Sequence, residues 1–206
     1  KNNIKKQTIK AFIPMLILMM GIGWADSLIP FSTKKEGRIG NYVLGVWPFE
    51  QKTAPSPAYA NPSGFIEITL KNINQQLSEH FKLGDFMDKN QANVWPKYMA
   101  LDTRLVDKLE LIINELSQAG VHVKHLAVMC GFRSPHSNST FGDTRGRGKL
   151  SRHMFGDAAD IYVDNNQSGW TDDLNHDGRV NIEDAKIIAQ AAERVEAKYP
   201  RLVGGI

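Results

Sequence analysis

Apolar residues recur at helical spacing in two stretches of the chain, residues 101–119 and residues 182–199. In both stretches an aliphatic side chain returns every three or four positions, with charged residues in between. This spacing is typical of amphipathic helices that bury one face. Gly120 follows the first stretch and is expected to end it. The pattern therefore predicts two packed helices, one near the middle of the chain and one near its end.

Two other stretches have the composition of buried strands. Residues 121–133 are rich in Val, Leu, Met and Phe, and residues 158–163 are similarly apolar. The Gly- and Arg-rich residues 141–149 between them predict a flexible basic loop. The order helix, strand, loop, strand, helix lacks the rhythm of a parallel sheet. We therefore predict an α+β fold in which a small antiparallel sheet is flanked by helices.

The first 25 residues have the pattern of a targeting segment. Lysines are followed by a short apolar run and by small residues at Gly23 and Ala25, as in a secretory signal peptide cleaved after Ala25. An N-terminal anchor is the alternative, but the run is shorter than the ~20 residues of a comfortable membrane span. We therefore expect export to the periplasm or cell envelope, with a transient or N-terminal membrane association.

The chain after this segment divides into a linker and a domain. Residues 26–62 are rich in Lys, Gly, Pro, Ser and Ala, which predicts a mobile or surface-draped linker. Residues 41–49 within it are apolar enough to form a short docked strand. Residues 63–206 are predicted to be the main domain.

Composition narrows the function classes only a little. The 25 Lys and Arg against 22 Asp and Glu give a formal charge of +3, which does not indicate nucleic-acid binding. Cys130 is the one cysteine, so no disulfide forms within the chain. Its apolar neighbours Val128, Met129 and Phe132 predict an inert core thiol.

His153 and Asp160 are candidate metal ligands at the second predicted strand. Imidazole and carboxylate groups are typical ligands of catalytic zinc. Asp160 shares a strand face with Ala158, and small residues at Gly156 and Ala158 would leave room for a metal and a substrate. Taken alone, this pair is better explained as a turn histidine near a strand-end carboxylate.

A wider set of residues favours the interpretation of His153 and Asp160 as zinc ligands. It comprises Ser151, His153, Gly156, Ala158 and Asp160, preceded by residues 131–135 and Asn138. Together these residues resemble the bacterial zinc peptidase family of D-alanyl-D-alanine carboxypeptidases and murein endopeptidases, in its exported single-domain branch. The resemblance runs from about residue 64 to the end and takes in residues 81–86 and the helix at 101–120.

The resemblance implies a role for each matched residue. His153 and Asp160 would be two of three zinc ligands, and Arg133 would steady the substrate carbonyl or the oxyanion that develops on it. Ser151 and Asn138 would orient ligands or the neighbouring loop. The implied activity is zinc-dependent hydrolysis of the peptide stems or cross-links of bacterial peptidoglycan.

The third ligand of the family is a histidine on a late strand, near an acidic or histidine general base. Residues up to Ile206 contain no such strand, so we expect the domain to be C-terminally truncated and these groups to lie beyond it. His136, beside the Arg133 region, is the remaining candidate for a substitute. Residues 1–206 alone would then be a poor zinc binder without activity.

Residues 173–184 match the twelve-residue loop of a calcium site. The loop would offer side-chain oxygens from positions 1, 3 and 5, a glycine at 6, a carbonyl at 7, and further oxygens at 9 and 12. These positions are Asp173, Asn175, Asp177, Gly178, Arg179, Asn181 and Asp184. We predict structural Ca²⁺ here, with Asp184 a shorter ligand than the usual Glu.

The loop resembles a single dockerin repeat, but such repeats act in pairs and the sequence contains one. A clamp inside the peptidase domain is therefore the preferred interpretation. Two other functions stay open: a non-catalytic, calcium-stabilised cell-wall-binding or interaction protein, and a dockerin-like scaffold partner.

Overall fold

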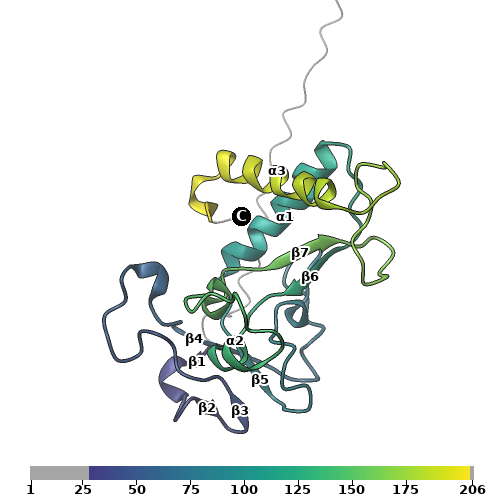
Figure 1. Ribbon diagram of the computed structural model, residues 1–206. Coiled ribbons are helices and arrows are strands. Elements are labelled where there is room, and N and C mark those ends of the chain that lie inside the picture. Colours follow the sequence, from purple (N-terminus) through teal and green to yellow (C-terminus); the bar gives the residue numbers. More distant parts are fainter. Residues whose placement is uncertain (1–27, 205–206) are drawn as a thin grey trace, which may run out of the picture.

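The computed structural model describes residues 28–204, so the predicted targeting segment at 1–25 lies outside the described residues. Two long helices, α1 (Thr103–Gln118) and α3 (Ile182–Lys198), pack against each other. The antiparallel pair of β6 (Leu126–Cys130) and β7 (Asp160–Val163) lies next to α1, and the small N-terminal strands lie on the far side of this pair (Figure 1). The short helix α2 (Pro135–Thr140) follows β6.

Three small sheets make up the strand content of the described residues, and all their pairings are antiparallel. One sheet has the order β1-β4-β5, the second pairs β2 with β3, and the third pairs β6 with β7. Their further bounds are β1 Ile29–Pro30, β2 Arg38–Ile39, β3 Tyr42–Val43, β4 Gly64–Ile68 and β5 Lys97–Met99. The predicted α+β class is thereby confirmed.

The two predicted helices form because their apolar stripes meet. In α1 the buried positions include Leu109, Ile112 and Leu116, which lie three and four residues apart. The helix starts at Thr103 rather than 101 because the Asp102 side chain accepts a hydrogen bond from the Arg104 backbone N–H and caps it. Helical periodicity therefore predicts which face of α1 is buried, whereas the capping residue Asp102 determines where the helix begins.

Residues 28–49 are packed, although their composition predicts a mobile or surface linker, whereas residues 51–60 are mostly exposed. Tyr42, Leu44 and Trp47 are almost fully buried, and the Trp47 ring lies 5.3 Å from that of Phe31 and 5.6 Å from that of Phe65 between centroids. The short strand expected within 41–49 corresponds to β3. This segment therefore belongs to the core that supports the rest of the domain.

None of the helices formed by residues 28–204 combines the length and the apolar composition needed to cross a bilayer.

Candidate metal centre

A β-bulge at the end of β6 places two candidate ligands side by side. Val128 pairs with Ile161, but the next partner of Asp160 is Cys130, so Met129 is an extra residue in the ladder. Directly opposed residues on antiparallel strands project to the same face. The side chains of Cys130 and Asp160 therefore share one face at the end of the β6–β7 pair where β6 ends and β7 begins.

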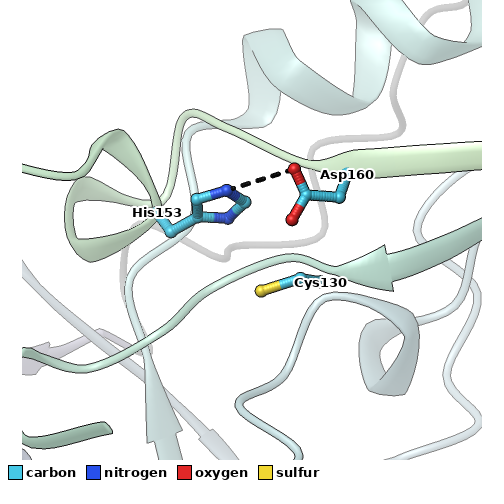
Figure 2. A group of neighbouring side chains, drawn as sticks. All are labelled: Cys130, His153 and Asp160. Carbon is cyan, nitrogen blue, oxygen red and sulfur yellow. Dashed lines mark ion pairs between the residues drawn. The ribbon is translucent and has the colours of Figure 1, made fainter. Parts of the chain in front are cut away.

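His153 approaches this face from η5 (Arg152–Phe155), a short 3₁₀ helix that precedes β7. Its Nδ1 lies 2.7 Å from the carbonyl oxygen of Gly131, and its Nε2 lies 3.5 Å from Oδ1 of Asp160. A carbonyl can only accept, so Nδ1 is the protonated nitrogen and Nε2 carries the lone pair in the neutral ring. Figure 2 shows this ring turned toward Asp160, with Cys130 on the neighbouring strand. Nε2 is thus the atom offered to a metal.

The three side chains suit a zinc ion. The ligand atoms of Cys130, His153 and Asp160 all lie within 4.8 Å of one another, and this is the one group of three or more His, Cys, Asp or Glu residues within 28–204 that is placed to hold a metal ion. Two donors that bind zinc at 2.0–2.1 Å in tetrahedral geometry lie roughly 3.3 Å apart. The 3.5 Å between Nε2 of His153 and Oδ1 of Asp160 is close to that separation. Zinc accepts nitrogen, oxygen and sulfur ligands.

The surroundings of the His153 ring favour positive charge. Burial lowers the pKa of His153, but its hydrogen bonds with Asp160, Cys130 and the Gly131 carbonyl outweigh burial and raise the pKa to about 10. The pKa of Asp160 lies below its usual value because of the His153 hydrogen bond, against the effect of burial, with a smaller contribution from the charge of Arg133. Without a metal, the ring therefore holds a proton on Nε2 beside Asp160, and a metal ion that binds Nε2 would displace this proton.

Arg133 and Ser151 lie beside this cluster. The backbone N–H of Arg133 donates to the carbonyl of His153 over 3.2 Å, and its Nη2 donates to Oγ of Ser151 over 3.3 Å. Its Nε is buried and has no partner among the described residues. The structure therefore brings together four of the residues singled out by sequence, namely Arg133, Ser151, His153 and Asp160.

Asn138 is further from this group and holds the basic loop. Its Nδ2 donates to the carbonyl oxygen of Gly148 over 3.2 Å. The loop at 141–149 lies where the sequence placed it, beside a hollow of about 410 Å³ whose lining includes Asn138, Arg147, Lys149 and Met154. Because Met154 directly follows His153, the hollow adjoins the segment that carries the candidate ligand.

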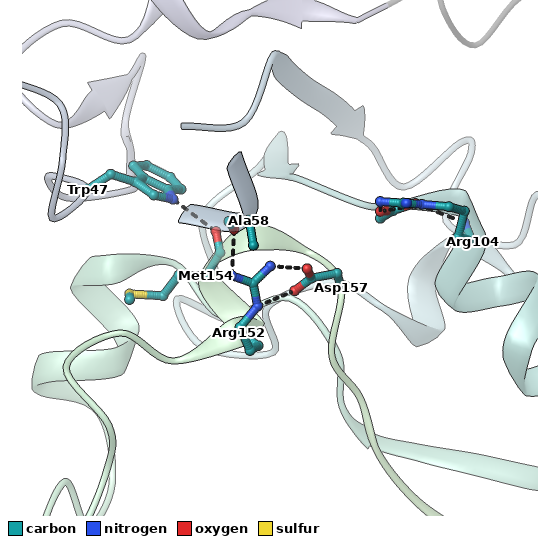
Figure 3. A network of polar contacts seen from close by, with 7 residues as sticks. Trp47, Ala58, Arg104, Arg152, Met154 and Asp157 are labelled. Atoms are coloured by element: carbon teal, nitrogen blue, oxygen red, sulfur yellow. Dashed lines mark hydrogen bonds and ion pairs between the residues drawn. The ribbon is translucent and has the colours of Figure 1, made fainter. Parts of the chain in front are cut away.

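A network that the sequence did not reveal holds η5 in place (Figure 3). Arg152 forms an ion pair with Asp157, and its Nη1 donates to the carbonyl of Ala58 over 2.5 Å. Nε1 of buried Trp47 donates to the carbonyl oxygen of Met154 over 2.9 Å. The opposite charges at 152 and 157 are visible in the sequence, but the contribution of Trp47 has no local signal.

The Trp47 hydrogen bond leads to a stability prediction. Trp47→Phe leaves the Met154 carbonyl without its donor, and burying an unsatisfied group costs about 1–3 kcal/mol. We expect a lower midpoint of urea unfolding with an unchanged slope. Trp170→Phe is the matched control because Trp170 is 79% exposed. Equal midpoints for the two variants would rule out the role assigned to Trp47.

Gly156 has a different use from the one expected. Its φ is 76°, and a Cβ at this position would lie 2.4 Å from the carbonyl oxygen of Ala100. Its own carbonyl accepts the backbone N–H of Asp102 over 2.9 Å. The glycine therefore allows the end of η5 to contact the start of α1, rather than making room for metal or substrate.

Two other expectations about ligands also change. Cys130 was expected to be an inert core thiol, but it is partly exposed at the strand end and faces the cluster. His136, the candidate substitute ligand, has its backbone N–H bound to the Leu44 carbonyl and its ring packed edge-on against Phe141. It lies outside the three-residue group.

The predicted calcium loop is closed by its own carboxylates. Asp173 accepts the backbone N–H of Gly178 over 2.8 Å. Asp184 is fully buried and accepts those of Leu174 and Asn181, each over 2.8 Å. Asp184 also forms a capping box with Asn181 at the start of α3. The loop is ordered in this form by hydrogen bonds, and Ca²⁺ binding stays a prediction.

The likeness to known proteins agrees with the position of the cluster. The family described as peptidoglycan L,D-endopeptidase MepK has a model that matches residues 58–169, more than half of the 206-residue chain. The match contains Cys130, Arg133, His153 and Asp160 and ends before the calcium loop. Comparison with curated proteins and with solved structures gives no match.

Proposed function

The chain belongs to this peptidoglycan L,D-endopeptidase family of zinc peptidases, and from that premise we propose that it hydrolyses L,D cross-links between peptide stems of peptidoglycan. His153 and Asp160 are the proposed zinc ligands. The observation that carries the proposal is the 3.5 Å approach of Nε2 of His153 to Oδ1 of Asp160. Nδ1 of His153 is held by a backbone carbonyl, which is the usual way to orient a zinc-binding imidazole.

The site residues divide the work of amide hydrolysis between them. Zinc bound there would polarise the scissile carbonyl and lower the pKa of water toward neutrality. Arg133 would donate hydrogen bonds to the carbonyl oxygen as negative charge develops on it, which stabilises the transition state more than the ground state. Ser151 accepts from Nη2 of Arg133 and keeps the guanidinium directed.

The hollow beside η5 is the proposed place for part of the peptide stem. Arg147 and Lys149 bring positive charge to its lining, and peptide stems carry carboxylates that such charges attract. Asn138 fixes the loop that bears them through its bond to Gly148. We assign Asn138 a positioning role at this loop, with peptidoglycan peptides as the binding partner.

Export is part of the proposal, because peptidoglycan lies outside the cytoplasmic membrane. The lysine-rich start, apolar run and small residues of positions 1–25 support a targeting segment. The proposed location is the periplasm or cell envelope.

The activity is tested on the full-length protein with purified muropeptides that carry either L,D or D,D cross-links. We expect separated stems from the L,D substrate, detected by mass spectrometry, with loss of product after EDTA and recovery with Zn²⁺. Cleavage confined to the D,D substrate would overturn the assigned bond. Absence of any product from a zinc-loaded protein would overturn the peptidase proposal.

A non-catalytic, calcium-stabilised wall-binding protein is the second candidate, supported by the closed loop at 173–184. This function predicts that the chain sediments with purified wall material in a Ca²⁺-dependent manner and releases no peptide, even with Zn²⁺ present.

Structural Ca²⁺ at this loop gives a stability prediction for either function. In metal-depleted protein, Ca²⁺ at about 100 times its Kd should raise the free energy of unfolding by about 2.7 kcal/mol, seen as a higher Tm. Asp177→Asn removes one ligand charge and should greatly reduce that rise. Asp143→Asn, in the exposed loop before β7, is the control and should keep it. An unchanged Tm on adding Ca²⁺ to the unsubstituted protein would refute calcium binding.

A further inference from the structure

We propose that Asp88 is a positioning residue for Arg133. Its buried carboxylate fixes the backbone that follows Arg133 and so keeps the guanidinium directed at the carbonyl that is cleaved. This inference rests on the proposed function, because it takes Arg133 as the group that stabilises the oxyanion. Asp88 lies outside the cluster of candidate metal ligands and would act on the reaction only through Arg133.

Arg133 lies on a short connection between the end of β6 and the start of α2. Its neighbours Phe132 and Ser134 are buried, whereas Arg133 itself is only partly buried. The connection belongs to no strand or helix, so its backbone groups need other hydrogen-bond partners to stay in one conformation. The direction of the Arg133 side chain therefore depends on which groups hold this backbone.

Three consecutive backbone N–H groups of the connection, beginning with the residue before Arg133, are bound by other parts of the chain. The first donates to the Phe86 carbonyl over 2.7 Å, and the second, of Arg133, donates to the His153 carbonyl over 3.2 Å. The third, of Ser134, donates to Oδ2 of Asp88 over 3.2 Å. Two of these acceptors are backbone atoms. Asp88 therefore supplies the acceptor that a substitution can remove.

Asp88 is itself held in place, as a fixed acceptor must be. The residue is 3% exposed, and its Oδ1 accepts the backbone N–H and Nδ2 of Asn90 over 3.0 and 2.8 Å. The Asn90 carbonyl in turn accepts from Nζ of buried Lys97 over 2.8 Å. Because Oδ1 is occupied in this way, Oδ2 is left for Ser134. A hydrogen bond to a charged acceptor is also stronger than one between neutral groups.

The residue after Asp88 contacts the same region of the fold. Nζ of Lys89 donates to the carbonyl oxygens of Val128 and Met129 over 2.8 and 3.2 Å. These carbonyls lie at the bulge of β6. The segment 86–89 therefore holds the end of β6 as well as the connection that follows it.

The test is Asp88→Asn in the full-length protein, with steady-state kinetics on the L,D cross-linked muropeptide. Asparagine keeps the size of the side chain but has one acceptor oxygen, so either Asn90 or Ser134 loses its partner. We expect kcat to fall by about 10–100-fold, because displacing a positioned group by 1 Å can cost about 100-fold. Zinc content and KM should change little, because the candidate ligands and the hollow beside η5 are unaltered.

A double substitution shows whether Asp88 acts through Arg133. In the Arg133→Met background, Asp88→Asn should cause little further loss of kcat, because the effects of residues that act as a unit are not additive. The same loss of kcat in both backgrounds would overturn the positioning role. An unchanged kcat in Asp88→Asn alone would also overturn it.

Asp164→Asn is the matched control for the loss of a buried carboxylate. Asp164 is 2% exposed and accepts the backbone N–H groups of Ser168 and Gly169. It follows β7, at the opposite end of the β6–β7 pair from Asp160. It should lower the Tm, as Asp88→Asn should, but leave kcat unchanged at a temperature where circular dichroism shows both variants folded. An equal fall in kcat in the two variants would trace it to destabilisation and overturn the role of Asp88.

Asp88→Glu provides a second variant if Asp88→Asn does not fold. It keeps a carboxylate but moves its oxygens by one methylene, so kcat should fall and the fall should disappear in the Arg133→Met background. A kcat equal to that of the unsubstituted protein would overturn the inference.

The outcomes separate this inference from the function on which it rests. If the unsubstituted full-length protein releases no stems, or if Arg133→Met has no effect on kcat, the proposed function fails. If stems are released and Arg133→Met lowers kcat while both Asp88 variants keep it, the role of Asp88 alone fails.

Discussion

In the full-length protein, replacing His153 with alanine is expected to remove bound zinc and to lower kcat/KM on L,D cross-linked muropeptides by more than about a thousandfold. Loss of a partner that only orients a ligand costs 10–100-fold, and His153 supplies a donor atom itself in the proposed site. Its Nε2 is the nitrogen that lies 3.5 Å from Asp160. The measurements are zinc content by mass spectrometry and the rate of stem release.

His122→Ala is the matched control for this experiment. His122 is exposed and its backbone carbonyl, which holds Asn165, is retained by the substitution. The control should keep zinc and activity. Calcium content is expected to be unchanged in both variants, because the loop at 173–184 uses other residues. Full activity of His153→Ala would refute the proposed ligand set, and parallel loss of both metals would show that the two sites are coupled.

Replacing Arg133 with methionine should lower kcat by about 10²–10³-fold, the usual effect of removing one oxyanion donor. Zinc content and KM should change little, since the guanidinium acts mainly on charge present in the transition state. Arg133→Lys should restore part of the rate, because it returns the charge without the planar fork. Steady-state kinetics on the same muropeptide separate kcat from KM.

Arg145→Met serves as the control for the loss of an arginine, since the Arg145 side chain is 91% exposed and pairs only with Asp143 among the described residues. It should leave kcat unchanged. A raised KM with an intact kcat in Arg133→Met would indicate that Arg133 binds the substrate in its ground state instead.

The helices were the part of the fold most accessible from sequence. Their stripes depend on residues three or four positions apart, and most of these residues are buried in α1 and α3. The ends depend on caps, so α1 begins after Asp102 rather than at 101. The strands were placed correctly but are shorter than their apolar stretches, because β6 spans only Leu126–Cys130 of 121–133.

The packing of residues 28–49 was not predictable from local composition. Trp47 is buried by contacts with Phe65 and by a hydrogen bond to Met154, residues far away in sequence. Glycine, proline and serine in this segment describe the turns between such contacts as well as they describe a linker. Only the fold distinguishes the two.

The candidate site likewise has residues that the sequence predicts and one residue that it does not. The spacing from Ser151 to Asp160 and the position of Arg133 were enough to select residues that the structure brings together. Cys130 was missed because its apolar neighbours suggested burial, and because strand alternation cannot anticipate a bulge. One extra residue at Met129 reverses which side chain faces Asp160.

The hydrogen bond from Trp47 to Met154 also has a consequence for dissecting this protein into fragments. The family match starts at residue 58, yet the indole that holds η5 comes from before that point and α3, which packs on α1, comes after residue 169. A piece cut to the matched range would expose Phe65 on one side and the apolar stripe of α1 on the other. The range matched by the family model, residues 58–169, is thus shorter than the part of the chain that we expect to fold as one cooperative unit.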